Sequence, residues 1–292
     1  MPVKQPRLDW NMRSFDATRF FRSKLEPAYL TDLGALYAGD CLPVLKSMHD
    51  ECADTVFADP PFNIGKIYRS ATNDSRPDTE YAAWCRKWLD ECVRILKPGG
   101  SIFIYNLPRW NVQLGAYLSG LGLDFRHWIA IEMSHRMPIV GRLHPSHYSL
   151  IYYSKGTPKT FQRIRTPIQL CRHCGKEVRD YGGHRDAMNP NGVTLKDVWT
   201  DIPSVRHWKY KSKNRNANAL STKILDRVVE MSTLPGDLVV DPFGGSGTTF
   251  VVCESRNRKW IGAEIDYIDD IIDRLNNDDI HPHKNNDFVE CC

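Results

Sequence analysis

The sequence predicts an α/β protein built on a doubly wound, mostly parallel β-sheet. Short apolar runs rich in β-branched and aromatic residues alternate with segments of helical periodicity, the pattern that parallel strands joined by helices produce. One of these runs leads into a glycine-rich turn and then an amphipathic stretch, as a strand, a turn and a helix would. The expected strands are 35–38, 54–57, 101–105, 127–131, 148–154, 238–240 and 260–264.

The clearest helix follows Thr79. Large apolar side chains recur there every three or four residues, so one face of this helix is expected to pack on the sheet. Gly99 and Gly100 are expected to end the helix, because glycine is common at helix C-termini. The apolar stripe consists of Tyr81, Trp84, Cys85, Trp88, Leu89, Cys92, Ile95 and Leu96.

Changes in composition divide the chain into four regions. Residues 30–156 and 220–275 carry the strand and helix patterns and are expected to form two halves of one sheet. Residues 157–219 are polar, basic and punctuated by proline and glycine, which indicates an insertion between the two halves. Residues 276–292 are polar and are expected to form a mobile tail.

The composition is that of a soluble globular protein. With 292 residues, of which 41% are hydrophobic, the chain can bury a sizeable core. It shows neither a membrane-spanning apolar run nor the apolar centre of a signal peptide, which predicts a cytoplasmic location and no membrane partner. Nine cysteines in such a chain are expected to stay reduced. A net charge of +4 does not by itself indicate nucleic acid, so that prediction depends on local clusters of charge.

The stretch ADPPFN (58–63) closes an apolar, strand-like run. It places an acid at Asp59, two prolines at Pro60 and Pro61, and an aromatic ring at Phe62. Proline fixes φ, restricts the residue before it and has no N–H, so the carbonyl between two prolines is held rigidly and is not used in a sheet ladder. The turn is therefore expected to present two hydrogen-bond acceptors, the Asp59 carboxylate and the Pro60 carbonyl.

A second informative stretch is LVVDPFGGSGTT (238–249). Glycines allow a ligand to approach the backbone closely, and a helix N-terminus offers N–H groups to an anion. Glu264 ends the next apolar strand, where an acid can accept hydrogen bonds from both ribose hydroxyls. The turn lacks the lysine of a phosphate-binding loop and the Gly-x-Gly-x-x-Gly spacing of dinucleotide enzymes. These features predict a site for a nucleoside-containing cofactor, with a plain tight turn as the alternative.

With both motifs in view, the chain resembles the β group of permuted DNA amino-methyltransferases, which modify adenine N6 or cytosine N4. The likeness rests on DPPFN (59–63) and DPFGGSGTT (241–249) in this order, with LYAGDC (36–41), KPGG (97–100) and most of 220–266 as further support. It implies the seven-stranded sheet of S-adenosylmethionine-dependent methyltransferases. It also implies that the insertion at 157–219 recognises the target.

The resemblance implies S-adenosylmethionine as the cofactor. Phe243, Gly245 and Gly247 would surround its methionine part, Glu264 would hold its ribose, and Asp40 would lie beside its adenine. Asp40 is equally suited to be the N-cap of a helix that follows it. The predicted cofactor site also includes Asp241, Ser246 and Thr248.

One departure from the family concerns the segment before the glycine motif. The family often carries His-Pro-x-Gln-Lys-Pro there, whereas this chain has ALSTKI (219–224), in which only the lysine is retained. Thr222 and Lys223 are expected to reach the methionine carboxylate. A solvent-facing helix start is the alternative for both residues.

The implied reaction is methyl transfer to the exocyclic amine of a base flipped out of DNA. Asp59 and the Pro60 carbonyl would accept hydrogen bonds from the amine, and Phe62 would stack on the base. An acid at position 59 favours adenine N6, with cytosine N4 as the alternative. An RNA-directed enzyme of the same fold and a DNA-binding protein with decayed catalysis are more distant readings. A nicotinamide-dependent oxidoreductase would need a different glycine spacing.

Double-stranded DNA is the expected partner. Segment 206–215 contains five Lys or Arg residues, two large aromatic residues and no acid, a composition suited to phosphate contacts, and a solvated basic loop is the alternative. Segment 66–78 is polar, follows the catalytic turn and is expected to be a mobile flap. A cognate restriction endonuclease and a homodimer are further expectations. The predicted DNA contacts are Lys66, Arg206, Trp208, Lys209, Lys211, Lys213 and Arg215.

Cys171 and Cys174 have the spacing of half a zinc site, with His184 as a third candidate ligand. The chain has no second Cys-x-x-Cys pair, so reduced thiols in a turn are the favoured interpretation. The predicted reaction itself requires no metal. A zinc ion at this position would be structural.

Overall fold

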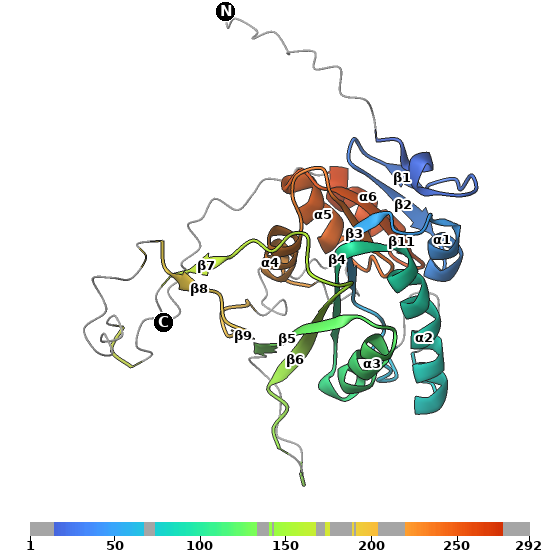
Figure 1. Cartoon of the computed structure of the whole chain (residues 1–292). Helices are drawn as coiled ribbons and strands as arrows, with labels where there is room; N and C mark the ends of the chain where they lie inside the picture. The colour runs from blue at the N-terminus through green and yellow to red at the C-terminus, as the bar shows by residue number, and fades with distance from the viewer. Residues whose placement is uncertain are drawn as a thin grey trace, which may run out of the picture.

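The computed structural model describes residues 15–66, 74–132, 140–141, 143–167, 173–175, 189, 191–203 and 220–276. These residues form a nine-stranded sheet in the order β1-β2-β11-β10-β3-β4-β6-β5-β9 (Figure 1). The strands are β1 (Tyr29–Leu30), β2 (Gly34–Ala38), β3 (Ala53–Ala58), β4 (Leu96–Asn106), β5 (Asp124–Glu132), β6 (His147–Ser154), β9 (Val198–Trp199), β10 (Leu238–Asp241) and β11 (Lys259–Glu264).

The sheet is mostly parallel, as the sequence predicts. Strands β2, β11, β10, β3 and β4 run parallel to one another, β1 runs antiparallel to β2, and β6 runs antiparallel between β4 and β5. All seven predicted strands are confirmed. The two additional strands, β1 and β9, are two-residue edge strands, and such short pairings carry too few residues for an alternating pattern to reveal them.

Helices cover both faces of the sheet, which gives three layers (Figure 1). One face packs against α1 (Cys41–Ser47), α2 (Asp78–Ile95) and α3 (Pro108–Gly120). The other packs against α4 (Thr222–Ser232), α5 (Thr248–Ser255) and α6 (Ile268–Asn276). Strand β3 serves both layers, because Val56 belongs to the first hydrophobic cluster and the adjacent Phe57 to the second.

The predicted end of the helix after Thr79 is wrong. Helix α2 stops at Ile95, and Gly99 and Gly100 lie inside β4. The pairing with β3 skips residues between Leu96 and Ser101, so the glycines form an excursion from the ladder, where Gly99 has φ +77°. The excursion is paired instead with the segment after β6, since the Gly99 N–H donates to the Lys155 carbonyl at 2.7 Å.

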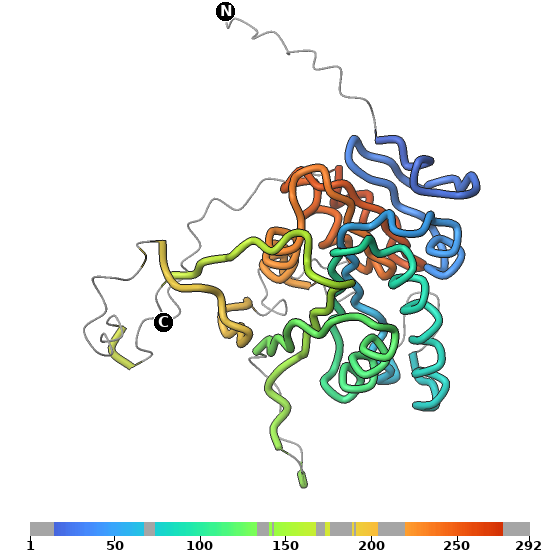
Figure 2. Tube along the Cα trace, viewed as in Figure 1, coloured from blue at the N-terminus to red at the C-terminus, as the bar shows by residue number. Residues whose placement is uncertain are grey.

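The two halves of the sheet interleave. Strands β10 and β11, from the C-terminal half, lie between β2 and β3, and Figure 2 shows the blue and red parts of the chain side by side. The register places Glu264 opposite Ala38 and Asp241 opposite Gly262. The carboxyl ends of β2, β11, β10 and β3 therefore share one edge of the sheet, the edge at which open α/β sheets bind ligands.

The described end of the insertion is attached to the sheet and to α4. Strand β9 pairs with β5, while β7 (Arg165–Thr166) and β8 (Val193–Thr194) form a separate two-stranded sheet. Asp201 accepts two hydrogen bonds from Arg227 of α4, at 2.9 and 2.6 Å, and the same guanidinium lies 4.9 Å from the ring centre of Trp199. The predicted region boundaries at 157, 220 and 276 stay predictions.

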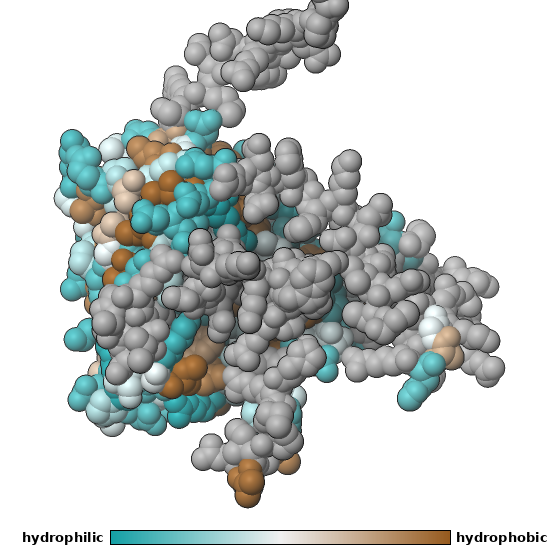
Figure 3. Space-filling view, turned by 180° about the vertical axis from the view of Figure 1, so that it is seen from behind, coloured by the Kyte–Doolittle hydropathy of each residue, from teal (hydrophilic) through white to brown (hydrophobic). Residues whose placement is uncertain are grey.

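The described surface carries no broad apolar band on the face drawn in Figure 3, where hydrophobic residues form small patches among hydrophilic ones. Among the large hydrophobic side chains that the structure describes, exposed ones on either face include Val112, Leu121 and Phe125. No described helix is long and apolar enough to cross a membrane. The predicted tail beyond Asn276 lies outside the described residues.

Candidate functional site

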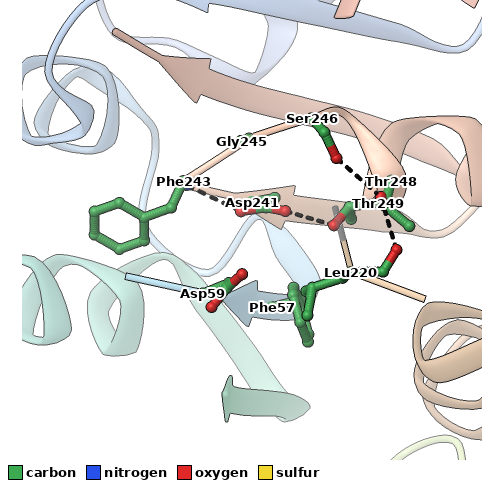
Figure 4. A pocket seen from close by; sticks show the side chains of 10 residues that line it. Phe57, Asp59, Leu220, Asp241, Phe243, Gly245, Ser246, Thr248 and Thr249 are labelled. Atoms are coloured by element: carbon green, nitrogen blue, oxygen red, sulfur yellow. Dashed lines mark hydrogen bonds between the residues drawn. The ribbon is translucent and has the colours of Figure 1, made fainter. Parts of the chain in front are cut away.

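A recess opens where β3 and β10 end, between the two motifs that the sequence singles out (Figure 4). Asp59 lies on one side of it and the glycine-rich turn on the other, so the catalytic and cofactor predictions meet in one place. Gly244 and Thr249 of the glycine-rich motif also line it, together with Phe57 and Leu220, which the sequence did not suggest. The lining residues are Phe57, Asp59, Leu220, Asp241, Phe243, Gly244, Gly245, Ser246, Thr248 and Thr249.

The DPPFN turn is held by side chains from α2 and α3. Each of the three backbone carbonyls after Pro60 accepts a hydrogen bond, whereas no described residue donates to the Pro60 carbonyl. These bonds fix the turn and do not involve the Pro60 carbonyl, which is predicted to accept a hydrogen bond from the substrate amine. The three bonds run from the Tyr81 hydroxyl to Pro61 at 2.5 Å, from the Trp110 indole to Phe62 at 2.9 Å and from the Arg109 guanidinium to Asn63 at 3.1 Å.

Replacing Tyr81 by phenylalanine tests this support. The Tyr81 hydroxyl also accepts a hydrogen bond from the Asn106 amide at 3.1 Å, so the change leaves two buried polar groups unpaired, at a cost of about 1–3 kcal/mol. We expect a lower melting temperature and a methyl-transfer rate reduced about tenfold, with cofactor affinity retained. Tyr117→Phe is the matched control, because that hydroxyl bonds Asp90 on the exposed surface. Equal transfer rates in the two variants would contradict the role of Tyr81.

Asn63 closes the turn and anchors the segment that follows. Its backbone adopts φ +56°, which asparagine tolerates better than most residues. Its amide bonds the Arg76 backbone in both directions, at 2.9 and 2.7 Å. The Lys66 N–H donates to the Asp74 carboxylate at 2.6 Å, so residues 66 and 74 are held together. Residues 67–73 of the predicted flap lie outside the described residues.

Asp59 has the electrostatic character of a functional acid. It is half-buried, and no described residue donates a hydrogen bond to its carboxylate. Burial raises the pKa of Asp59 well above its usual range, the negative charge of Asp241 raises it further, and Lys66 opposes both effects. A perturbed, unpaired acid in a recess is a functional-site candidate.

Asp241 is a structural acid at the end of β10. It is 2% exposed, and its two oxygens accept hydrogen bonds from the Thr249 hydroxyl at 2.5 Å and the Phe243 N–H at 2.9 Å. Burial raises the pKa of Asp241 to about 7, with a smaller contribution from Glu264. These bonds connect both ends of the glycine-rich turn to the strand. Its predicted contact with cofactor stays a prediction.

The raised pKa of Asp241 predicts a pH-dependent stability. A carboxyl with a raised folded-state pKa favours folding below its unfolded pKa of about 4, and this contribution is lost as pH rises towards 7. We expect the melting temperature of the wild type to fall relative to Asp241→Asn between about pH 4 and 7, and the difference to be constant above that range. Asp59 and Glu264 titrate in both proteins but interact with the Asp241 charge, so the difference reports Asp241 together with its coupling to these two acids. A difference that does not change with pH would contradict this assignment.

The glycine-rich turn requires its glycines. Gly245 and Gly247 have φ +53° and +75°, values at which other residues are strained. The Gly245 N–H donates to Glu264 at 2.6 Å, and the other Glu264 oxygen accepts from the Asp266 N–H at 2.8 Å. Burial raises the pKa of Glu264. Because each carboxylate oxygen has two lone pairs, Glu264 retains acceptor capacity for a ligand.

The other predicted residues of this site are placed as follows. Asp40 caps α1 by accepting from the Leu42 N–H at 2.7 Å, which confirms the capping interpretation and leaves its exposed carboxylate beside the ends of β2 and β11. Phe243 packs against Trp84 and Trp88 of α2. Phe62 is half-buried and packs against two tyrosines from the neighbouring strands, Tyr105 and Tyr148.

Lys223 is engaged elsewhere. Its ammonium lies 2.7 Å from the Asp201 carboxylate and 3.0 Å from the Asp201 carbonyl oxygen, so it holds the insertion against α4. Thr222 lies in the first turn of α4, as the alternative interpretation of both residues predicts.

The sequence missed Arg274 of α6, which contacts the glycine-rich turn. Nothing local in the sequence distinguishes Arg274 from a solvated helix residue.

Most predicted DNA contacts cannot be placed. Only Lys66 of that set is described, and Cys174, an exposed free thiol, is described without its two proposed zinc partners. The described residues contain no cluster of metal-binding side chains. The predicted positions outside the described residues are Cys171, His184, Arg206, Trp208, Lys209, Lys211, Lys213 and Arg215.

Comparison with known sequences identifies a family and several relatives. The sequence profile of the N6_N4_Mtase family, described as DNA methylase, matches residues 53–272. The type II methyltransferase M.BamHI of Bacillus amyloliquefaciens is 54% identical over 257 residues, which are 88% of this chain and 60% of M.BamHI. M.BglII of Bacillus subtilis is 31% identical over 88% of this chain and 72% of its own length. This chain thus spans less than two thirds of M.BamHI.

Solved structures share the fold. PvuII DNA methyltransferase, described as cytosine-N4-specific, has a TM-score of 0.60 and 23% identity and covers 89% of this chain and 92% of its own. M1.HpyAVI in complex with S-adenosylmethionine has a TM-score of 0.56 and 19% identity, over 84% of this chain and all of its own. These likenesses show the fold, and the profile covers both motifs of the recess. The chain belongs to the N6_N4_Mtase family of DNA methylases.

Proposed function

We propose that this chain transfers a methyl group from S-adenosylmethionine to the exocyclic amine of a base in double-stranded DNA. One feature carries the proposal: the recess joins the Asp59 side of the DPPFN turn to the glycine-rich turn. Family membership supports it, since the matched profile is that of DNA methylases. M.BamHI is named a type II methyltransferase, which supports DNA as the substrate.

The residues of the recess fit S-adenosylmethionine. Glu264 has lone pairs for the ribose hydroxyls, Asp40 is exposed at the adjacent strand end, and the glycine-rich turn lets a ligand approach the backbone. Nearby carboxylates suit a ligand that carries a positive sulfonium. The cofactor would supply an electrophilic methyl group. The structure of M1.HpyAVI with S-adenosylmethionine supports this choice for a protein of the same fold.

Asp59 and Pro60 would activate the amine. An exocyclic amine is a poor nucleophile, because its lone pair is delocalised into the ring. Two acceptors that take both amine hydrogens return electron density to the nitrogen and stabilise the positive charge that develops on it. The pKa of Asp59 would fall again when a positively charged cofactor occupies the recess, because opposite charge favours the ionised acid. Phe62 would stack on the flipped base, a contact worth about 1–3 kcal/mol.

We propose adenine N6 as the methylated amine, because Asp59 occupies the position at which an acid accompanies adenine in the family that the chain resembles. One observation favours cytosine N4 as a second candidate. The PvuII enzyme, which shares the fold, is described as cytosine-N4-specific. The acceptor chemistry of Asp59 and Pro60 serves either amine, so the product decides between them.

The DNA contacts remain part of the proposal. Residues 206–215 and Lys66 would hold the phosphates, and the insertion at 157–219 would recognise the target sequence. Relatives named type II methyltransferases support a cognate restriction endonuclease as a biological partner. A homodimer is proposed without further support from the described residues.

The nature of the polymer can be tested directly. The protein is incubated with S-adenosylmethionine labelled in the methyl group and, in parallel, with double-stranded DNA, single-stranded DNA or RNA of the same sequence. We expect label in double-stranded DNA and a background level with Asp59→Ala. Label in RNA alone would contradict the proposal, and bound cofactor without label in any polymer would favour decayed catalysis.

A further inference from the structure

Two exposed arginines lie beside the DPPFN turn, outside both sequence motifs. Arg76 precedes α2 by two residues, and Arg109 lies in the first turn of α3. Both are attached to Asn63, the last residue of the DPPFN stretch. The Asn63 side-chain amide bonds the Arg76 backbone at 2.9 and 2.7 Å, and the Asn63 carbonyl accepts from Arg109 Nη2 at 3.1 Å. The positions of both arginines are therefore fixed relative to Asp59.

Each of the two guanidinium groups lies over an aromatic ring. That of Arg76 is 5.0 Å from the ring centre of Trp84, and that of Arg109 is 4.6 Å from the ring centre of Trp110. Stacking fixes the plane of a guanidinium and leaves the N–H groups at its edge able to donate. Both residues are exposed, and no described carboxylate forms an ion pair with either.

The edge of the sheet that carries the two arginines also carries acids. Strand β3 places Ala58 opposite Ile104 of β4, so the DPPFN turn and the start of α3 lie at one edge. Ionised Asp59 at this edge repels the phosphates of an approaching duplex, and so do Asp78 and Glu80 in the first turn of α2. Two guanidinium groups beside the turn offset this repulsion and leave Asp59 available to the amine.

We propose that Arg76 and Arg109 bind backbone phosphates of the DNA next to the base that enters the recess. The inference rests on the proposed DNA substrate and adds two phosphate contacts to those of the proposed function. A guanidinium pairs with a phosphate through parallel N–H donors, which suits both residues to this role. Phosphate contacts hold the duplex in place without reading its sequence.

The salt dependence of DNA binding tests this assignment. The probe is a short fluorescent duplex from genomic DNA that the protein methylates, with S-adenosylhomocysteine in place of the methyl donor. Dissociation constants are measured by fluorescence anisotropy between about 0.05 and 0.2 M salt. We expect Arg76→Gln and Arg109→Gln each to weaken binding about fivefold to tenfold and to lower the slope of log Kd against log salt by about 1. Transfer rates at saturating DNA should stay within about threefold of the wild type.

Arg86→Gln is the matched control for both changes. Arg86 is an exposed residue of α2 whose guanidinium lies 5.3 Å from the ring centre of Tyr117. It lies about 12 Å further along the helix than the first residue of α2, so the change removes the same charge and a similar stacking contact away from the turn. It should leave the slope unchanged. Arg109→Lys keeps the charge and should also keep the slope of the wild type.

The contradicting results are distinct. Unchanged slopes in Arg76→Gln and Arg109→Gln would remove both residues from the DNA interface, and a reduced rate at saturating DNA would then assign them to support of the turn. An equal change of slope in Arg86→Gln would mean that only the net charge of the protein matters. A wild type that methylates RNA and not duplex DNA would overturn the proposed function itself, and with it this inference. Melting temperatures of every variant establish that the compared proteins are folded.

Discussion

Asp59→Asn is expected to slow methyl transfer by about 10³-fold while S-adenosylmethionine affinity stays within about threefold of the wild type. Asparagine keeps the size of the side chain and removes its negative charge, so the amine loses the acceptor that stabilises positive charge in the transition state. The carboxylate has no hydrogen-bonding partner among the described residues, so few structural contacts are lost with it. Single-turnover rates and calorimetric dissociation constants measure the two effects separately.

Asp32→Asn is the control for this change. Asp32 is exposed beside the amino end of β2, at the edge of the sheet opposite the recess, so the same loss of charge there should leave transfer unchanged. A retained rate in Asp59→Asn would remove Asp59 from the chemistry. A dissociation constant that rises by the same factor as the rate falls would make Asp59 a cofactor-binding residue.

Gly245→Val is expected to weaken cofactor binding by about 100-fold or more, since a branched side chain in the turn both strains the backbone and occupies the recess. Gly245 has φ +53° and lines the recess, and an added Cβ would meet no atom closer than 3.8 Å, so we expect a valine side chain there to take up space in the recess. Transfer should fall with binding. Dissociation constants and melting temperatures are the measurements.

Gly236→Val separates strain from obstruction. Gly236 has φ +86°, and nothing lies within 4 Å of an added Cβ, so valine there carries a similar backbone cost in the turn before β10. It should lower the melting temperature without changing cofactor affinity. If both variants weakened binding equally, strain would explain the effect and the glycine-rich turn would lose its assigned role.

The positions of the seven main strands along the chain were predictable because buried parallel strands form continuous apolar runs. The two motifs were predictable because glycine and proline have distinctive backbone preferences, so that their clusters mark turns in the sequence. Strands β1 and β9 were not, since two residues make no period. The predicted helix end at Gly99 was wrong because glycine is suited both to a helix C-terminus and to an irregularity within a strand.

The contacts that hold the site in place could not be predicted from the sequence, for a different reason. Tyr81 and Trp110 belong to apolar helix faces, and only the fold shows that their polar atoms reach the DPPFN carbonyls. Lys223 was assigned by its position in a motif, whereas its partner Asp201 comes from the insertion. Such contacts join segments far apart in the chain. Their pairing depends on tertiary structure, which local patterns do not encode.

The identity of the methylated nucleoside tests the central claim most directly. Unmethylated genomic DNA is incubated with the protein and S-adenosylmethionine, digested to nucleosides and analysed by mass spectrometry. We predict a methyl group on an exocyclic amine, and Asp59 indicates N6 of adenine. A methyl group on N4 of cytosine would still agree with activation of an amine. Methylation at a ring carbon, such as C5 of cytosine, would contradict activation of an amine by Asp59 and the Pro60 carbonyl.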